Sequence, residues 1–135
     1  MSLFNVFDIA GSAVSAQSLR LNTTASNLAN ADSVAGDAAS AYRSRHPVFQ
    51  ASPLADGRSG VGVRMLGVVE SNAPATVRHD PGHPLANADG DVFAANVDPV
   101  AELVNMISAS RSYQTNVEVM NTSKTLLIRT LSLGQ

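Results

Sequence analysis

Residues 98 to 134 read DPVAELVNMISASRSYQTNVEVMNTSKTLLIRTLSLG, and this stretch decides the fold class. Steps of three and four residues from Leu103 onward reach nine positions, of which seven are apolar. The nine are Leu103, Met106, Ser110, Tyr113, Val117, Met120, Lys124, Leu127 and Leu131. A heptad pattern of this length is typical of a long helix that pairs with another helix. Asp98 as N-cap and Pro99 at the first helical position predict where the helix begins, and Gly134 predicts where it ends.

The N-terminus carries a second heptad pattern. Steps of four and three residues reach nine positions there, and seven are again apolar. They are Leu3, Phe7, Ala10, Val14, Gln17, Leu21, Thr24, Leu28 and Ala31. Residues 1 to 31 contain only two charged side chains, Asp8 and Arg20. A helix that is apolar or small nearly all round is a buried helix, so we expect more than one partner surface to cover it.

Between the two patterns the helical period disappears. Residues 61 to 65 alternate apolar side chains with glycine and arginine, and this two-residue period predicts a strand. A turn at the Asp-Gly pair of residues 56 and 57 would connect it to an earlier short strand around residues 48 and 49. The segment GDVFAANV, residues 90 to 97, predicts one more short strand.

The sequence therefore predicts a mainly α fold with a small β region. Residues 1–34 form the N-terminal helix, residues 98–135 the C-terminal helix, and residues 35–97 a short, loop-rich β insert. We expect the two long helices to pair as a coiled-coil-like hairpin through the heptad positions given above. Lys124 is a charged residue in that seam, and it either specifies the register or marks where the pairing ends.

Composition argues against several functions. Nine basic and eleven acidic residues, in a chain that is only 15% charged, leave no footprint for nucleic acid. The absence of cysteine excludes disulfides, thiolate metal sites and cysteine nucleophiles. The N-terminal segment lacks the basic region of a secretory signal, and its uncharged runs are too short and polar to cross a bilayer. We expect no nucleic-acid partner, no cleavable signal peptide and no direct membrane insertion.

His79 and His83 raise the question of a metal site, because two histidines four residues apart can share a helical face. Pro81 and Gly82 lie between them and argue against a helix, and no further histidine cluster completes the four ligands of a structural zinc site. No nucleophile-elbow, zinc-protease or phosphate-loop motif occurs in the sequence. We therefore expect no catalytic residue, no metal and no cofactor.

Four motifs of the sequence resemble, in the same order along the chain, the motifs of one known family. The chain closely resembles the bacterial flagellar basal-body rod proteins over nearly its whole length. Its short middle region argues for the proximal rod, because distal rod and hook members carry larger insertions. It departs from the usual family pattern at Asp91 and Ala95, which leaves the turn geometry of residues 90 to 96 open. The motifs are SAQSLRLNTTASNLANADS (15–33), AYRSRHPVF (41–49), HDPGHPLANADG (79–90) and the C-terminal run from Asn96 to Gln135.

The resemblance implies a structural subunit of an axial tube, with the terminal helices in the inner layer and the β region facing outward. Implied partners are the other proximal rod proteins, the distal rod protein, the rod-to-export-gate adaptor and further copies of the chain. It also implies export by the flagellar type III apparatus to a rod that crosses the periplasm. The alternative is a non-flagellar coiled-coil adaptor, which would share the heptads without needing the four motifs.

Three polar residues are candidates for contacts within and between subunits. Asn27 and Asn30 lie where the first helix ends, and their amides are able to bond backbone groups freed at helix ends, within the chain and across subunits. The other interpretation is a fraying, solvated helix end. Arg111 lies beside the seam, where it either pairs with a carboxylate of a neighbouring subunit or extends along its own helix.

Overall fold

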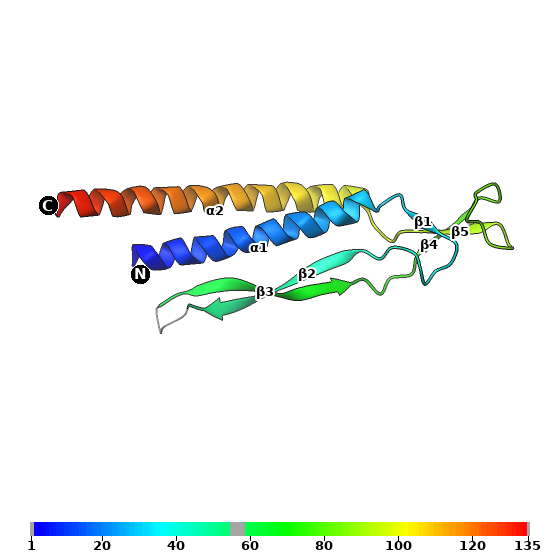
Figure 1. Ribbon diagram of the computed structural model, residues 1–135, viewed down its shortest axis with the longest axis horizontal. Helices are drawn as coiled ribbons and strands as arrows, with labels where there is room; N and C mark the ends of the chain where they lie inside the picture. The colour runs from blue at the N-terminus through cyan, green and yellow to red at the C-terminus, as the bar shows by residue number, and fades with distance from the viewer. Residues whose placement is uncertain (1, 55–58, 135) are drawn as a thin grey trace. The chain divides into compact units, whose positions relative to one another are not determined.

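The computed structural model describes residues 2–54 and 59–134, which form two long helices and five strands. Helix α1 spans Leu3–Ala29 and helix α2 spans Pro99–Leu133 (Figure 1). At a rise of about 1.5 Å per residue, they are about 40 Å and 52 Å long. The predicted mainly α fold with a small β insert is confirmed. The predicted turn at residues 56 and 57 lies outside the described residues.

The ends of both helices follow local side-chain chemistry. Asp98 caps α2, since its Oδ1 accepts hydrogen bonds from the backbone N–H groups of Val100 (2.9 Å) and Ala101 (3.3 Å). The predicted start of α2 at Pro99 is confirmed. Helix α1 begins after Ser2, whose Oγ accepts from the N–H of Phe4 at 3.3 Å.

The strands form two separate sheets. Strands β2 (Arg45–Pro53) and β3 (Val61–Glu70) make a two-stranded ribbon, which contains both strands predicted from residues 48–49 and 61–65. The other sheet has the order β1-β5-β4, with β1 at Val34–Ala35, β5 at Asp91–Ala94 and β4 at Thr76–His79. Strand β5 confirms the strand predicted in residues 90–97.

Strands β1 and β4 were not predicted. Strand β1 has two residues, too few to show a period, and β4 is exposed along its whole length, so it lacks an apolar face. Both pair with β5 in antiparallel register, with Ala35 opposite Phe93 and Val77 opposite Phe93. Asp91 and Ala95 do not disturb this region, because β5 begins at Asp91 and the N–H of Ala95 donates to the Ser33 carbonyl at 3.0 Å.

The described chain divides into two compact units. The first unit comprises the described residues of Met1–Leu21, Pro47–Gly67 and Ile107–Gln135, and the second comprises Asn22–His46 and Val68–Met106. Each long helix contributes residues to both units, as does the β2–β3 ribbon.

In the first unit, α1 lies between α2 and the β2–β3 ribbon (Figure 1). The ribbon approaches α1 closely at Gly62, where an added Cβ would lie 2.8 Å from Ser12 Oγ. Ser12 Oγ accepts from the N–H of Val63 at 3.0 Å and donates to the Ile9 carbonyl at 2.7 Å. One helix hydroxyl thus satisfies an edge N–H of β3, and only glycine fits beside it.

The second unit has a small core. Val92 is fully buried, and Ala41 and Ala95 are nearly so. Asn27, which is 1% exposed, is the largest fully buried polar side chain of this unit. Few apolar side chains are buried in this unit. Hydrogen bonds from buried polar side chains therefore contribute much of what holds its backbone in place.

Candidate assembly interface

Asn27 in the last turn of α1 acts as a pairing partner for the first residue of β2. Its Oδ1 accepts from the N–H of Arg45 at 2.9 Å, and its Nδ2 donates to the Arg45 carbonyl at 2.8 Å. The hydroxyl of Tyr42 donates to the same Oδ1 at 3.0 Å. A single amide therefore satisfies both backbone groups of one residue, as a neighbouring strand would.

Asn96 bonds the N–H of the adjacent residue, Ser44, and links it to a third segment. Its Oδ1 accepts from the N–H of Ser44 at 2.7 Å, and its Nδ2 donates to the Ala73 carbonyl at 2.7 Å. The Ser44 carbonyl accepts from the N–H of Ser71 at 2.8 Å. We call the set Asn27, Tyr42, Ser44, Arg45 and Asn96 the polar junction. Sequence reasoning missed Asn96, because an asparagine at the end of a predicted strand gives no sign of the segments that it joins.

Asn30 closes the end of α1 within the chain. Its side-chain Nδ2 donates to the backbone carbonyl of Ser26 at 2.8 Å, and its backbone carbonyl accepts from the Ser33 hydroxyl at 2.8 Å. The burial of Asn27 excludes a solvated, fraying helix end at that residue. Both asparagines are thus used inside the chain.

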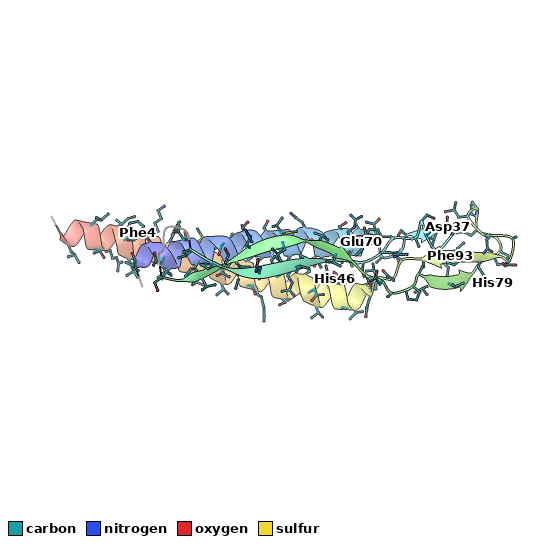
Figure 2. All side chains as sticks on the ribbon, turned by 90° about the horizontal axis from the view of Figure 1, so that it is seen from below. Phe4, Asp37, His46, Glu70, His79 and Phe93 are labelled. Atoms are coloured by element: carbon teal, nitrogen blue, oxygen red, sulfur yellow. The ribbon has the colours of Figure 1, made fainter. Side chains whose placement is uncertain are left out.

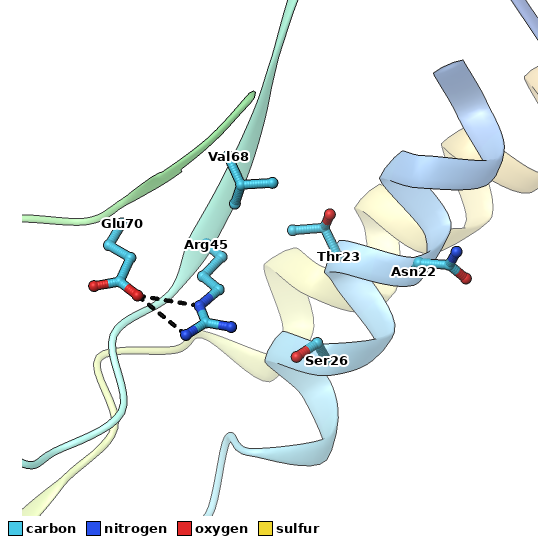
Figure 3. Close-up of a pocket in the computed structure, with 6 residues that line it drawn as sticks. All are labelled: Asn22, Thr23, Ser26, Arg45, Val68 and Glu70. Atoms are coloured by element: carbon cyan, nitrogen blue, oxygen red, sulfur yellow. Dashed lines mark hydrogen bonds and ion pairs between the residues drawn. The ribbon is translucent and has the colours of Figure 1, made fainter. Parts of the chain in front are cut away.

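Beside the polar junction lies an open cleft with a volume of about 420 Å³ (Figure 3). It is lined by Asn22, Thr23, Ser26, Arg45, Val68 and Glu70. Arg45 Nη2 lies 3.1 Å from Glu70 Oε1, and the Arg45 guanidinium lies 5.7 Å from the centre of the Tyr42 ring. The two ion-pair side chains are about half exposed, so the pair adds little stability. Five of the six lining residues are polar and the cleft is open to solvent, which suits a protein contact better than an enclosed ligand.

The large apolar residues of the predicted α1 seam are all half-buried. They are Leu3, Phe7, Val14, Leu21 and Leu28. Between them, Ala10 and Thr24 are almost fully buried. A Cβ added at Gly11 would lie 3.9 Å from Cε of Met120, which places this part of α1 against α2 in the first unit.

On α2 only part of the predicted seam is covered. Met106, Tyr113, Val117, Met120 and Leu127 are half-buried, whereas Leu103 is 47% exposed and Leu131 is 72% exposed. The most buried residues of α2 lie one position before those that the pattern selected. They are Glu102, Ala109 and Ser123. Small side chains reach this face because interaxial distance depends on the side chains at the contact.

Large apolar side chains remain exposed along α2. They are Val100, Leu103, Val104, Ile107, Val119, Leu126, Ile128, Leu131 and Leu133. Phe4, at the start of α1 (Figure 2), is 64% exposed. Arg111 is exposed, and its side chain has no hydrogen bond or ion pair with the residues that the structure describes. Such exposure on one helix is typical of a surface that another protein covers.

His79 and His83, the two histidines considered as metal ligands, make their contacts within the β4–β5 region. His79 Nδ1 lies 2.8 Å from Asp91 Oδ1 across the β4–β5 pair, and His83 Nδ1 accepts from the N–H of Leu85 at 3.1 Å. Figure 2 labels His79 in this sheet together with Phe93. Among residues 2–54 and 59–134, no group of three or more His, Cys, Asp or Glu side chains is placed to hold a metal ion.

One carboxyl group has a shifted pKa, and its environment is local. Hydrogen bonds from the Ser40 hydroxyl, the Ser40 N–H and the Ala39 N–H hold the pKa of Asp37 below its usual value. These bonds close a short turn after β1, so the lowered pKa of Asp37 results from the local structure of this turn. No helix in the described part of the chain combines the length and apolar character that a membrane span needs.

Comparison with known proteins agrees with this arrangement. Residues 7–36 match the family model "Flagella basal body rod protein", and residues 92–133 match "Flagellar basal body rod FlgEFG protein C-terminal". These matches cover most of both helices, including Asn27, Asn30 and Arg111.

Curated relatives match the chain over its full length. It is 55% identical to the flagellar basal-body rod protein FlgC of Salmonella typhimurium and 56% identical to that of Escherichia coli O157:H7, in each case over 135 residues and all of both chains. It is 44% identical to the FlgC of Buchnera aphidicola subsp. Schizaphis graminum over 137 residues. The resemblance inferred from the four motifs is confirmed, and so is the expectation, drawn from the short middle region, of a proximal rod protein.

Proposed function

Because the chain belongs to the family of flagellar basal-body rod proteins called FlgC, we propose that it is a subunit of the proximal rod. It polymerises with other rod proteins into the axial drive shaft that transmits torque and encloses the export channel. The observation that carries this proposal is the identity of 55% to FlgC over the full length of both chains. The exposed apolar side chains of α2 agree with it, because an assembled helix covers such side chains.

Residues 1–34 and 98–135 contribute the inner axial layer in this proposal, and residues 35–97 face outward. Two observations support the inner position: α1 carries only two charged side chains, Asp8 and Arg20, and α2 exposes large apolar side chains. Both long helices then contribute their seam residues to the packing of the tube. The half-buried state of Phe7 and Tyr113 leaves part of each side chain available to a neighbour.

The proposed partners are the other proximal rod proteins, the distal rod protein, the rod-to-export-gate adaptor and further copies of the chain. The subunit travels through the flagellar type III export apparatus without a cleavable signal peptide, and the rod crosses the periplasm. Membership of the rod family supports these partners as a class. Catalysis and cofactor binding have no part in this role.

Arg111 is proposed to pair with a carboxylate of a neighbouring subunit. The absence of a partner for its side chain among the described residues supports this assignment. Asn27 and Asn30 are proposed to contribute to subunit contacts indirectly, by holding in place the backbone segments that form the contact surface. Their own amides already form hydrogen bonds inside the chain.

Complementation tests the proposed function. The chain is expressed in a Salmonella strain from which the resident FlgC has been deleted, and we expect swimming motility and complete basal bodies by electron microscopy. The matched control is the same strain with the empty vector. Normal expression and export with no rod assembly would overturn the proposal.

A further inference from the structure

Helix α2 carries two neighbouring heptad faces in the first unit. The inner seam is buried or half-buried and consists of Ala109, Tyr113, Asn116, Met120, Ser123 and Leu127. The outer seam lies one residue further on at each step. It consists of Ile107, Ser110, Gln114, Val117, Asn121, Lys124, Ile128 and Leu131. From Ser110 onward, the seven predicted positions alternate between these two faces, which explains why Lys124 and Leu131 are exposed.

The outer seam has the geometry of a helix-packing surface. Its residues follow the alternation of three and four that brings side chains onto one stripe of a helix. Apolar side chains mark both ends, where Ile107 is 59% exposed and Leu131 is 72% exposed. The stripe from Ile107 to Leu131 is about 36 Å long at the helical rise. An occupant that covers both ends is therefore itself a long helix.

The polar residues in the middle of the outer seam determine which side chains the facing helix must carry. Gln114 and Asn121 offer amides, and Lys124 offers an ammonium group that has no hydrogen bond or ion pair with the described residues. A charge covered by a packed helix needs a counter-charge, since an unpaired buried charge is strongly destabilising. The facing helix accordingly carries a carboxylate opposite Lys124 and apolar side chains toward its ends.

Self-pairing of the outer seam does not meet this requirement. An antiparallel second copy with Ile107 opposite Leu131 would set Lys124 opposite Gln114, and a parallel copy would set it opposite another Lys124. Neither arrangement supplies a carboxylate from the outer seam, and the parallel one opposes like charges, which is destabilising.

We propose that the outer seam of α2 binds a helix of a neighbouring rod subunit, through a face other than the outer seam itself, and that a carboxylate of that helix pairs with Lys124. The inference rests on the proposed function, because it assumes that the chain enters the rod. It adds the face that is used and the charge pattern of the partner.

Charge reversal tests the proposal in the complemented strain. Lys124→Glu places a carboxylate opposite a carboxylate, and we expect at least a tenfold loss of complete rods, which corresponds to about 1.4 kcal/mol. Arg129→Glu is the matched control, since it makes the same charge change on an exposed residue of α2 outside the outer seam. Circular dichroism of both purified variants should match that of the unmodified chain.

Site-specific photo-cross-linking identifies the neighbour even where a variant fails to assemble. A photoreactive residue at Gln114 should cross-link to a helix of another rod subunit whose peptide contains Asp or Glu, and one at Thr115, beside the seam, should give at least a tenfold lower yield. Failure of the unmodified chain to complement would reject the proposed function. Complementation with full assembly of Lys124→Glu, or cross-links from Gln114 only to the outer seam of a second copy, would overturn this inference alone.

Discussion

The polar junction and the C-terminal half of α2 differ in how completely the chain satisfies them. At the junction, Asn27 and Asn96 provide partners for the backbone N–H groups of Arg45 and Ser44, and the carbonyls of both residues are also bonded. In residues 107 to 133, all of which the structure describes, only Ala109 and Ser123 are buried.

This difference assigns separate tasks to the two regions. Buried polar groups must be bonded within the chain, because an unpaired one costs about 1–3 kcal/mol. Exposed apolar side chains carry a smaller cost in the free subunit and give a favourable contribution when another surface covers them. We therefore expect substitutions at the junction to change folding, and substitutions on the exposed face of α2 to change assembly.

The largest effect on folding is expected at Asn27. Asn27→Ala removes the partners of the Arg45 N–H and carbonyl, which leaves two backbone groups in a buried site without hydrogen bonds. The free energy of unfolding should fall by about 2–4 kcal/mol, measured by urea denaturation. Asn22→Ala, an exposed asparagine of the same helix, is the control. Equal losses of stability in the Asn27 and Asn22 variants would contradict the expectation that the polar junction stabilises the fold.

Gly62 gives the next largest effect. Gly62→Ala places a methyl group 2.8 Å from Ser12 Oγ, so α1 and β3 must move apart. We expect a loss of about 1–3 kcal/mol in the free energy of unfolding. Gly67→Ala lies in the same strand with nothing within 4 Å of its added Cβ, and it should change stability much less. A stable Gly62→Ala variant would show that the contact between α1 and the ribbon is loose.

A smaller effect is expected at the start of α2. Asp98→Ala removes the side chain that accepts hydrogen bonds from Val100 and Ala101, and the cost should be about 1 kcal/mol. Asp98→Asn retains an accepting oxygen and should restore most of this stability. Thermal unfolding followed at 222 nm measures both variants. No difference between them and the unmodified chain would mean that the cap is not needed.

The smallest effect on folding is expected at Leu131. Because this side chain is 72% exposed, Leu131→Ser should change the free energy of unfolding by about 0.5 kcal/mol or less. The same change should lower the number of complete rods per cell in the complemented strain. A large loss of stability in the isolated subunit, with normal rods, would reverse the assignment of tasks to the two regions.

The helices and the ribbon were predictable because their signals are local. The N-cap at Asp98 and the heptad periods predicted α2, and the alternation at residues 61 to 65 predicted β3. Strand β4 was not predictable, because it gains its partners only when β5 lies beside it. Of the site residues, Asn27 was selected for its position at a helix end, whereas its partner Arg45 lies 18 residues away and had no sequence signal.

The sequence by itself determined two long helices, the start of the second helix, a strand-bearing middle and the family to which the chain belongs. The tertiary structure decided which face of α2 is covered and which backbone groups the asparagines bond. A heptad pattern counts apolar residues, whereas two helices approach most closely where side chains are small, so Ala109 and Ser123 are buried and Leu131 is exposed. Asn96 and Ser44 are 52 residues apart, and only the folded backbone brings an amide to within 2.7 Å of the N–H that it serves.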